Sequence, residues 1–411
     1  MKTELSTSLL NPADGKLANE ILRKCVHCGF CNATCPTYQL IGDEKDGPRG
    51  RIYLIKQVLE GKEYSESTRT HLDRCLTCRN CETTCPSGVE YSKLLDIGRK
   101  VVEENTSRSF QESLKRKALL NLLPYRNRFT PAIKLGRVFK PFLPKSLSKK
   151  IPKRVAKGTY PVAGYDRKMI ILEGCVQPAL SPDINSATAR VLHRLGISLV
   201  QPKSAGCCGA VNQHLSDDDN ALVFMKQNID AWWNELESGV EAIVITASGC
   251  GSMVKDYAHY LRGDQDYAEK AKKVSALCKD ISEIIADEGY EKLIHKDSAV
   301  KNNLPKISWH PPCTLQHGQK VNGVVEKILS DCCFDLLPVL DSHLCCGSAG
   351  TYSVLQPEIS QKLQTNKINN LQKNNPEMIV TGNIGCQTHL QEVSGVPVMH
   401  WIHLLDQLDR S

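Results

Sequence analysis

The chain has no long hydrophobic run. Its longer apolar stretches, such as 242–249, fall far short of the roughly 20 residues that a helix needs to cross a bilayer. The N-terminal segment 1-MKTELSTSLLNPADGK-16 contains neither the apolar core nor the cleavage site of a secretory signal. We therefore expect a cytoplasmic protein, and the reducing conditions of that compartment argue against a large disulfide framework.

Two signatures of cofactor enzymes are absent as well. No G-x-G-x-x-G motif opens a strand–helix unit, so the chain shows no dinucleotide-binding pattern. The C-x3-C-x2-C spacing of radical-generating clusters does not occur either. With 41% hydrophobic residues over 411 positions, the chain is nevertheless long and apolar enough for several globular domains.

Cysteine, in contrast, is abundant: the chain has 19, and most of them fall into repeating patterns. The run 25-CVHCGFCNATCP-36 recurs further along the chain as 75-CLTCRNCETTCP-86. Both have the C-x2-C-x2-C-x3-C-P spacing of bacterial ferredoxins, in which the fourth cysteine of each run ligates the other of two [4Fe-4S] clusters. The runs therefore predict one cluster on Cys25, Cys28, Cys31 and Cys85, and a second on Cys75, Cys78, Cys81 and Cys35. Zinc is the competing metal, but structural zinc usually takes two separated C-x2-C pairs.

A second duplication lies in the C-terminal half. Cys175, Cys207 and Cys208 recur at one constant offset as Cys313, Cys345 and Cys346, and Cys250 recurs at nearly the same offset as Cys386. Strand-like and helix-like segments alternate in both copies, which indicates a parallel α/β sheet in each. Because ligands gather outside the carboxyl ends of parallel strands, we expect the four cysteines of each copy to converge.

Apolar runs and helical periodicity predict the following elements. The strands are expected at 169–172, 197–200, 242–246, 306–309, 334–339 and 378–381, and helices at 48–62, 184–194 and 219–236. Prolines at 124, 131, 141, 144 and 152 are expected to break any long helix between the two duplications. The domain junction is placed there.

These motifs resemble those of the bacterial glycolate oxidase iron-sulfur subunit family. The residues that carry the resemblance are the paired runs, 46-DGPRGRIYLIKQVLEG-61, 174-GCVQP-178, 206-GCCGAVNQHL-215, 247-ASGCG-251, 311-PPCTLQH-317, 343-HLCCGSAGTY-352 and 384-IGCQTH-389. The resemblance is weakest across 105–165. The wider family joins an α-helical ferredoxin domain to two cysteine-rich CCG domains. It includes heterodisulfide reductase subunits, lactate-utilisation proteins and the electron-transfer subunit of anaerobic glycerol-3-phosphate dehydrogenase.

The resemblance implies a multidomain α/β protein. An N-terminal α-helical ferredoxin domain with two clusters is followed by two tandem α/β CCG domains. The expected boundaries are 1–104 for the ferredoxin-type domain with motifs at 14–45 and 66–95, 105–165 for a basic linker, and 166–300 and 301–411 for the CCG domains.

The resemblance also implies a division of labour. Separate flavin subunits, which carry the FAD, oxidise glycolate to glyoxylate, and the iron-sulfur subunit carries electrons one at a time towards a membrane or quinone-type acceptor. No acid/base pair suited to a 2-hydroxy acid marks this chain, so we expect no catalytic residue on it. The alternatives are an equivalent subunit for lactate, another 2-hydroxy acid or glycerol-3-phosphate, and a heterodisulfide-reductase-like thiol enzyme.

The CCG motif of the wider family ends in a cysteine that this chain lacks. Met253 occupies that position in the first copy and His389 in the second. Thioether and imidazole are poorer cluster ligands than thiolate. A third cluster or metal site and a structural, docking or redox-thiol role are therefore both open for Cys175, Cys207, Cys208, Cys250, Cys313, Cys345, Cys346 and Cys386. Cys278, Cys332 and Cys333 lie outside the repeat and are expected to be buried.

Acidic residues are scarce between 108 and 168. This segment has 17 Lys or Arg against two acids, a local charge of +15, whereas the whole chain has +7. Apolar residues alternate with basic ones across 126–154, a composition that fits the cytoplasmic face of an anionic inner membrane, an acidic flavin subunit or a solvated linker. Nucleic-acid binding is not expected, because no recognition helix accompanies the charge.

Overall fold

The computed structural model describes residues 1–6, 9–62, 64–142, 151–162, 164–293 and 304–408. Its internal contacts divide the chain into two compact units. The first comprises 1–118, 213–216 and 343–367, and the second comprises 119–212, 217–342 and 368–411. Each unit is described by itself below.

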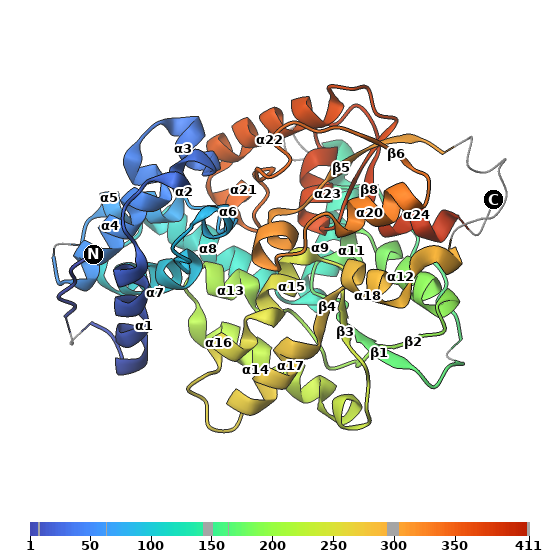
Figure 1. Ribbon diagram of the computed structural model, residues 1–411, viewed down its shortest axis with the longest axis horizontal. Helices are drawn as coiled ribbons and strands as arrows, with labels where there is room; N and C mark the ends of the chain where they lie inside the picture. The colour runs from blue at the N-terminus through green and yellow to red at the C-terminus, as the bar shows by residue number, and fades with distance from the viewer. Residues whose placement is uncertain (7–8, 63, 143–150, 163, 294–303, 409–411) are drawn as a thin grey trace. The chain divides into compact units, whose positions relative to one another are not determined.

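The first unit is helical (Figure 1). Its elements are α1 Pro12–Lys24, α2 Phe30–Ala33, α3 Pro36–Ile41, η1 Glu44–Asp46, α4 Pro48–Leu59, α5 Glu66–Asp73, α6 Asn80–Thr84 and α7 Tyr91–Asn105, joined by α21 Tyr352–Leu355. Proline occupies the first position of α1, α3 and α4, where its missing N–H costs no intrahelical bond. The predicted helix at 48–62 is confirmed as α4.

The core of the first unit forms where α1, α4 and α7 pack together. Ile21, Leu22, Ile55, Leu94 and Leu95 are fully buried there. The close approach of α4 and α7 depends on Gly98, since a Cβ at that position would lie 2.7 Å from Ile55 Cγ1. This packing holds the loops that carry the two cysteine runs.

The second unit contains two four-stranded parallel sheets with the same topology, and Figure 1 labels strands of both. The first has the order β2-β1-β3-β4, with β1 Lys168–Ile171, β2 Ser198–Val200, β3 Ile243–Ile245 and β4 Cys278–Asp280. The second has the order β6-β5-β7-β8, with β5 Lys306–His310, β6 Asp335–Leu337, β7 Met378–Thr381 and β8 Val398–His400. All six predicted strands are confirmed, and the edge strands β4 and β8 were not predicted.

Helices flank both sheets. In the first repeat they are α11 Gln177–Leu180, α12 Asp183–Arg194, α14 Asp218–Glu237, α15 Ser248–Lys255, α16 Tyr257–Tyr260, α17 Ala268–Leu277, α18 Ile281–Glu288 and η3 Tyr290–Leu293. In the second they are the π-helical turn Thr314–Gly318, α20 Val324–Asp331, α23 Ile384–Gln391 and α24 Ile402–Gln407. Three further helices, α8 Phe110–Leu122, α13 Ala210–His214 and α22 Pro357–Gln372, have residues in both units.

The two repeats of the second unit share one hydrophobic core. It includes Val244 and Ile281 from the first repeat together with Ile307, Val380 and Trp401 from the second. Polar bonds add to it: the Arg190 guanidinium pairs with Asp406 at 2.6 Å. His400 Nε2 lies 2.8 Å from the Thr246 carbonyl oxygen. The duplicated halves therefore fold as one body.

The proline-rich segment contains longer helices than the sequence predicted. Helices α8 Phe110–Leu122 and α9 Arg126–Phe139 run through it, followed by the short η2 Lys140–Phe142, and Pro131 lies inside α9. The expectation that prolines break any long helix is confirmed at Pro124 and Pro141, through which no α-helix runs, and is wrong at Pro131, which lies inside α9. Pro124 precedes α9, Pro141 follows it, and Pro131 removes only one N–H, close to the start of the helix.

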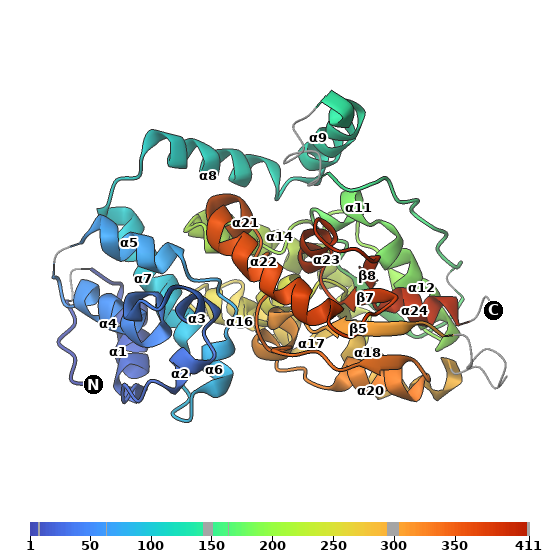
Figure 2. The same cartoon turned by 90° about the horizontal axis from the view of Figure 1, so that it is seen from above.

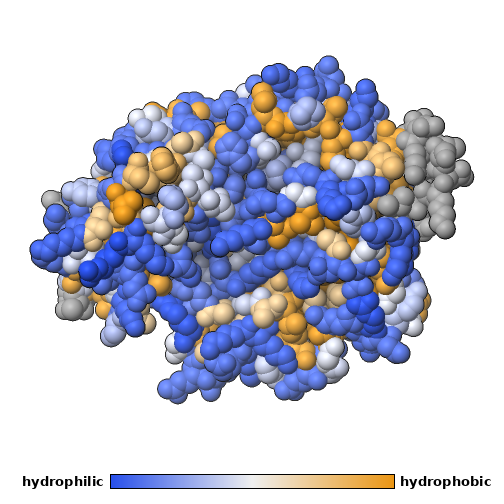
Figure 3. Space-filling view, in the orientation of Figure 1, coloured by the Kyte–Doolittle hydropathy of each residue, from blue (hydrophilic) through white to orange (hydrophobic). Residues whose placement is uncertain are grey.

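Surface hydrophobicity on the face drawn in Figure 3 is divided into separate areas among hydrophilic residues. Within the described ranges, no helix combines the length and the hydrophobicity required to span a bilayer.

Candidate metal centres

The first cysteine-lined cavity lies at the C-terminus of α1. Cys25, Cys28 and Cys31 of the first run line it, together with Cys85 of the second run. Cys25 ends α1, and its N–H donates to the Leu22 carbonyl oxygen at 3.3 Å. His27 and Gly29 have the left-handed backbone values φ 56° and φ 86°. Left-handed residues in such a turn direct successive N–H groups towards one concave side, which suits a group carrying negative charge.

The second cavity repeats this arrangement with the second run. Cys75, Cys78 and Cys81 line it together with Cys35 of the first run. Thr77 and Arg79 have φ values of 54° and 59°, at the positions equivalent to His27 and Gly29. The Thr77 N–H donates to Cys75 Sγ at 3.4 Å. Each run thus contributes its first three cysteines to one cavity and its fourth to the other, and Cys81 lines both cavities.

The two cavities are neighbours. Pro48, Cys81 and Tyr91 line both of them. Tyr91 is buried, and its burial raises the pKa of the phenol well above its ordinary value, so the ring stays neutral. Sequence reasoning missed Tyr91, because nothing in its local pattern distinguishes it from a core tyrosine.

Burial also affects the thiols. It raises the pKa of Cys25, raises that of Cys31 to about 11, and raises that of Cys81 well above its ordinary value. These thiols therefore favour the protonated form unless a cation compensates their charge. Each of the two adjacent cavities is lined by three cysteines of one run and the fourth of the other, with Cys81 shared between them. With N–H donors in the wrapping turns, this donor set fits a pair of iron-sulfur cubes.

A buried charge network borders the second cavity. Arg51 lines this cavity and is 1% exposed. Its guanidinium donates to the His71 carbonyl oxygen at 2.7 Å and to Thr37 Oγ1 at 3.1 Å, and it pairs with Asp46 at 3.4 Å. Asp46 also binds His71 Nδ1 at 3.0 Å and Arg74 at 2.9 Å.

This network is not a cation site. Ligand atoms of Asp43, Asp46 and His71 do lie within 4.8 Å of one another. However, the guanidinium groups of Arg51 and Arg74 already neutralise Asp46 and would repel a metal ion. The network is better described as a fixed positive charge beside the second cavity.

Four thiols converge in the first repeat of the second unit, as expected from the sequence. Cys175 follows β1, Cys207 and Cys208 follow β2, and Cys250 lies on α15 after β3. The Cys207 thiol is hydrogen-bonded to Cys175 and Cys208, and the Cys250 thiol to Cys208. These contacts, with burial, raise the pKa of both Cys207 and Cys250 well above the ordinary value.

The backbone around Cys207 and Cys208 is held by polar side chains. Asn228 Nδ2 donates to the Cys207 carbonyl oxygen at 2.7 Å, and the Tyr257 hydroxyl donates to that of Cys208 at 2.9 Å. Gly209 has φ 89°, which favours glycine after the cysteine pair. Met253, at the position of the missing cysteine, is buried.

The second repeat has the same cysteine-pair turn. Gly347 has φ 88°, and its N–H lies 3.4 Å from Cys345 Sγ, as the Gly209 N–H does from Cys207 Sγ. Residues 343–367, which include Cys345 and Cys346, belong to the first unit by their contacts. There, Asn80 Nδ2 donates to the His343 carbonyl oxygen at 3.2 Å, and the Tyr352 hydroxyl donates to that of Arg74 at 3.0 Å.

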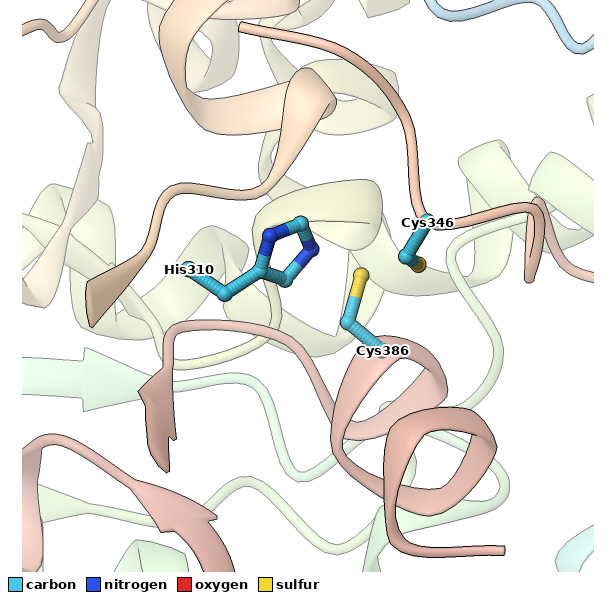
Figure 4. Close-up of side chains that lie close together, drawn as sticks. All are labelled: His310, Cys346 and Cys386. Atoms are coloured by element: carbon cyan, nitrogen blue, oxygen red, sulfur yellow. The ribbon is translucent and has the colours of Figure 1, made fainter. Parts of the chain in front are cut away.

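Cys313 and Cys386 lie in the second unit. Cys313 precedes the π-helical turn, and Cys386 lies on α23. Ligand atoms of His310, at the end of β5, and Cys386 lie within 4.8 Å of each other, and Figure 4 draws both side chains together with Cys346. His389, at the position of the missing cysteine, is buried on α23. His310 adds a buried imidazole that the first repeat lacks, since the equivalent position there is Leu172.

The three cysteines outside the repeats have different environments. Cys278 and Cys332 are buried, as expected, at 2% and 3% exposure. The same expectation for Cys333 was wrong, because this residue is exposed. Cys333 follows the C-terminus of α20 with φ 68°, a left-handed position that ends the helix and directs the chain outward.

Comparison with known proteins agrees with this arrangement. A family model described as a 4Fe-4S dicluster domain matches residues 21–89, and one described as a cysteine-rich domain matches 169–255 and 307–391.

Individual relatives match most of the chain. The glycolate oxidase iron-sulfur subunit of Escherichia coli (strain K12) is 52% identical over 408 residues, covering 99% of both chains. A probable glycolate oxidase iron-sulfur subunit of Bacillus subtilis (strain 168) is 30% identical over 91% of this chain and 88% of its own. Lactate utilization protein A of Oceanobacillus iheyensis is 27% identical over 58% of this chain and 96% of its own. The chain therefore belongs to the glycolate oxidase iron-sulfur subunit family, which combines a dicluster domain with two cysteine-rich domains.

Proposed function

We propose that this chain is the electron-transfer subunit of a flavin-dependent glycolate oxidase or dehydrogenase. The observation that carries the proposal is the exchange of cysteines between the two runs: each of two adjacent cavities is lined by the first three cysteines of one run and the fourth cysteine of the other, and Cys81 lines both. The 52% identity to a glycolate oxidase iron-sulfur subunit supports the choice of complex. In this proposal FAD is bound by partner subunits in a hetero-oligomer, and the chain itself has no substrate site.

The proposed ligand assignment rests on the cysteine spacing and is supported by the cavity linings. One [4Fe-4S] cluster is assigned to Cys25, Cys28, Cys31 and Cys85, and the other to Cys75, Cys78, Cys81 and Cys35. When bound, such clusters transfer single electrons, and two in series suit a flavin that releases two. The protein contributes by excluding water, donating backbone N–H groups to sulfur and placing the Arg51 charge beside the second cavity.

The onward route is proposed to pass from the second cavity towards the second repeat. The segment carrying Cys345 and Cys346 belongs to the first unit, and Tyr352 of that segment bonds the backbone of Arg74. We also propose a third cluster or metal site in the repeats, since Cys175, Cys207, Cys208 and Cys250 are linked by thiol contacts. The acceptor is proposed to be a quinone-type molecule at the cytoplasmic face of a membrane, which the chain contacts peripherally.

The domain division of 1–104, 105–165, 166–300 and 301–411 is kept as part of the proposal. This division follows the cysteine repeats. In the structure, by contrast, residues 343–367 belong to the first, helical unit. Separate expression of 1–104 tests whether the ferredoxin-type part folds and takes up iron without that segment.

The test is anaerobic purification with co-expressed flavin subunits. We expect brown protein with about eight iron atoms from the two cubes, more if the repeats are loaded, and dye reduction driven by glycolate. Lactate and glycerol-3-phosphate are assayed in parallel. If the dye is reduced faster with lactate or glycerol-3-phosphate than with glycolate, that compound and not glycolate is the substrate of the complex. Reduction of a disulfide substrate by the chain alone would favour the thiol-enzyme alternative.

Cysteine variants test the ligand assignment. Cys35→Ser is expected to remove the paramagnetic signal of the second cluster and to lower glycolate-dependent dye reduction by at least about tenfold, because one ligand of four is lost. Cys333→Ser, which changes an exposed cysteine outside both cavities, is the matched control and is expected to behave like the parent. Colourless protein that holds zinc and gives no signal after dithionite would disprove the proposal.

A further inference from the structure

Helix α9 belongs to the second unit and contacts the rest of it through one face. On that side Phe129 is buried at 7% exposure. Arg137 donates to the carbonyl oxygens of Pro152 at 3.1 Å and Ala179 at 3.0 Å. Lys140 Nζ donates to the Ile151 carbonyl oxygen at 2.5 Å. Figure 2 shows α9 standing out from the second unit next to α11.

The start of α9 lies close to the thiols of the first repeat. Tyr125, which caps the helix, packs edge-to-face on Phe224 with the ring centres 5.5 Å apart. Phe224, Cys175 and Cys207 form one small buried core, and Tyr125 packs against it. The helix is therefore anchored beside a candidate redox site.

The opposite side of α9 is apolar and exposed. Leu135, Val138, Phe139 and Phe142 are exposed by 60%, 69%, 50% and 84%. Their spacing of i, i+3, i+4 and i+7 places all four on one helical face, which continues into the short η2. Single exposed apolar residues are common on protein surfaces, but a continuous stripe of four large ones marks an interaction surface.

Basic residues flank this apolar stripe, and the sequence around it contains no acidic residue. Between residues 113 and 165 the sequence contains no Asp or Glu. Among described residues, Lys134 and Arg128 are exposed on the same helix, and Lys153, Arg154 and Lys157 are exposed in the segment that follows. Apolar side chains bordered by cations complement an anionic bilayer surface, where the former enter the acyl boundary and the latter contact headgroups.

We propose that α9 lies in the plane of an anionic membrane, with Leu135, Val138, Phe139 and Phe142 inserted at the headgroup–acyl boundary. This deepens the proposed function, on which it rests for the membrane-bound acceptor. The attachment places the thiols of the first repeat near the bilayer, through the contact between Tyr125 and the core around Cys175. The occupant of the stripe is lipid, and an acidic protein partner is the competing outcome of the test.

Vesicle sedimentation tests the surface. The purified chain is mixed with vesicles of phosphatidylcholine alone or with added phosphatidylglycerol. We expect sedimentation with the anionic vesicles, weakening as salt is raised. The triple variant Val138→Ser, Phe139→Ser, Phe142→Ser is expected to bind them more than about tenfold less tightly, because three large apolar groups no longer leave water. The control is Val223→Ser, which removes an apolar residue of similar exposure, 58%, from α14.

A direct readout of insertion completes the test. Phe142→Trp keeps the stripe apolar and adds a fluorophore on it. Vesicles containing brominated lipid should quench this added fluorescence, in contrast to the four native tryptophans. Equal vesicle binding by parent and triple variant, or no quenching at position 142, would overturn the proposal.

The competing outcomes are separable. If the triple variant keeps vesicle binding but no longer copurifies with the flavin subunits, the stripe is a protein interface and the lipid assignment is wrong. Iron content and glycolate-dependent reduction of a soluble dye are expected to be unchanged in the triple variant. If the parent complex itself shows no glycolate-dependent dye reduction, this counts against the proposed function, whatever the vesicle result.

Discussion

At the scale of single residues, the buried charge of Arg51 is the feature with the clearest consequence. Its guanidinium lines the second cavity, whereas Arg49 of the first cavity is partly exposed and paired with Glu44. A fixed positive charge favours the reduced, more negative state of a nearby cluster. The second cluster is therefore expected to have the higher potential, which favours electron flow from the first to the second.

Arg51→Gln tests this expectation. The variant should lower the potential of the second cluster in an EPR-monitored redox titration and leave that of the first nearly unchanged. It should also lose about 1–3 kcal/mol of unfolding free energy, since the buried His71 carbonyl oxygen loses its donor while Asp46 keeps its pairing with Arg74. Arg51→Lys should restore part of the potential, and Arg49→Gln serves as the control. Equal shifts of both clusters in Arg51→Gln would contradict the argument.

At the residue scale, the sequence indicated the cysteines of the two runs but not which charged side chains are buried beside them. The cysteine spacing predicted the exchange of the fourth cysteines, Cys35 and Cys85, which the cavity linings show, but it did not predict that Cys81 lines both cavities. Arg51 was visible only as one of several basic residues near the runs. Its burial depends on Asp46, His71 and Thr37, which the fold brings together from three elements.

At the scale of elements, His400 connects the last strand to the first repeat. Burial lowers the pKa of His400 to about 3, so the imidazole is neutral in the folded protein. An unfolded chain takes up the proton near pH 6.5, and it therefore binds more protons than the native state as the pH falls from there towards 3. The stability due to neutral His400 is full above about pH 6.5 and is lost progressively below it.

Chemical unfolding at about pH 7.5 and about pH 5.5 checks this prediction. Between about pH 7.5 and about pH 5.5, the unfolding free energy of the parent should fall by about 1 kcal/mol more than that of His400→Gln, because the glutamine side chain takes up no proton on unfolding. Trp401 fluorescence reports the transition next to the substitution, and His259→Gln on α16 is the control. The same pH dependence in parent and His400→Gln would refute the role of this histidine.

Elements were predicted well where hydrophobicity is periodic and poorly where it is not. The six predicted strands are central or strongly apolar. The missed strands β4 and β8 have three residues each, and β4 reads Cys-Lys-Asp, which no apolar pattern marks. They pair because β3 and β7 offer free edges, so their formation depends on tertiary structure.

At the scale of the whole molecule, the two units differ in what holds them together. The second unit has a continuous apolar core shared by both repeats. The first has short helices around the cavities, with four residues in α2 and five in α6. Short helices are not stable by themselves and need tertiary contacts or a bound group.

Iron removal should therefore affect the units unequally. After anaerobic chelation, hydrogen exchange is expected to become fast across 25–36 and 75–86, where the loops and short helices surround the cavities. The amides of β1, β3, β5 and β7 should keep their protection. Uniform loss of protection over both units would contradict this, and so would unchanged exchange around the cysteine runs. Loading the same protein with iron and sulfide should restore the protection.

The exchange of Cys35 and Cys85 has a consequence for how the protein matures in the cell. A ribosome that has synthesised only the first run has made three of the four sulfurs for the first cavity, and Cys85 emerges only at the end of the second run. With the proposed ligands, neither of the two proposed clusters can be completed on a nascent chain before the second run has been translated. The proposed assignment therefore predicts that cluster assembly waits until both runs exist, and that damage to either run leaves both clusters short of a ligand.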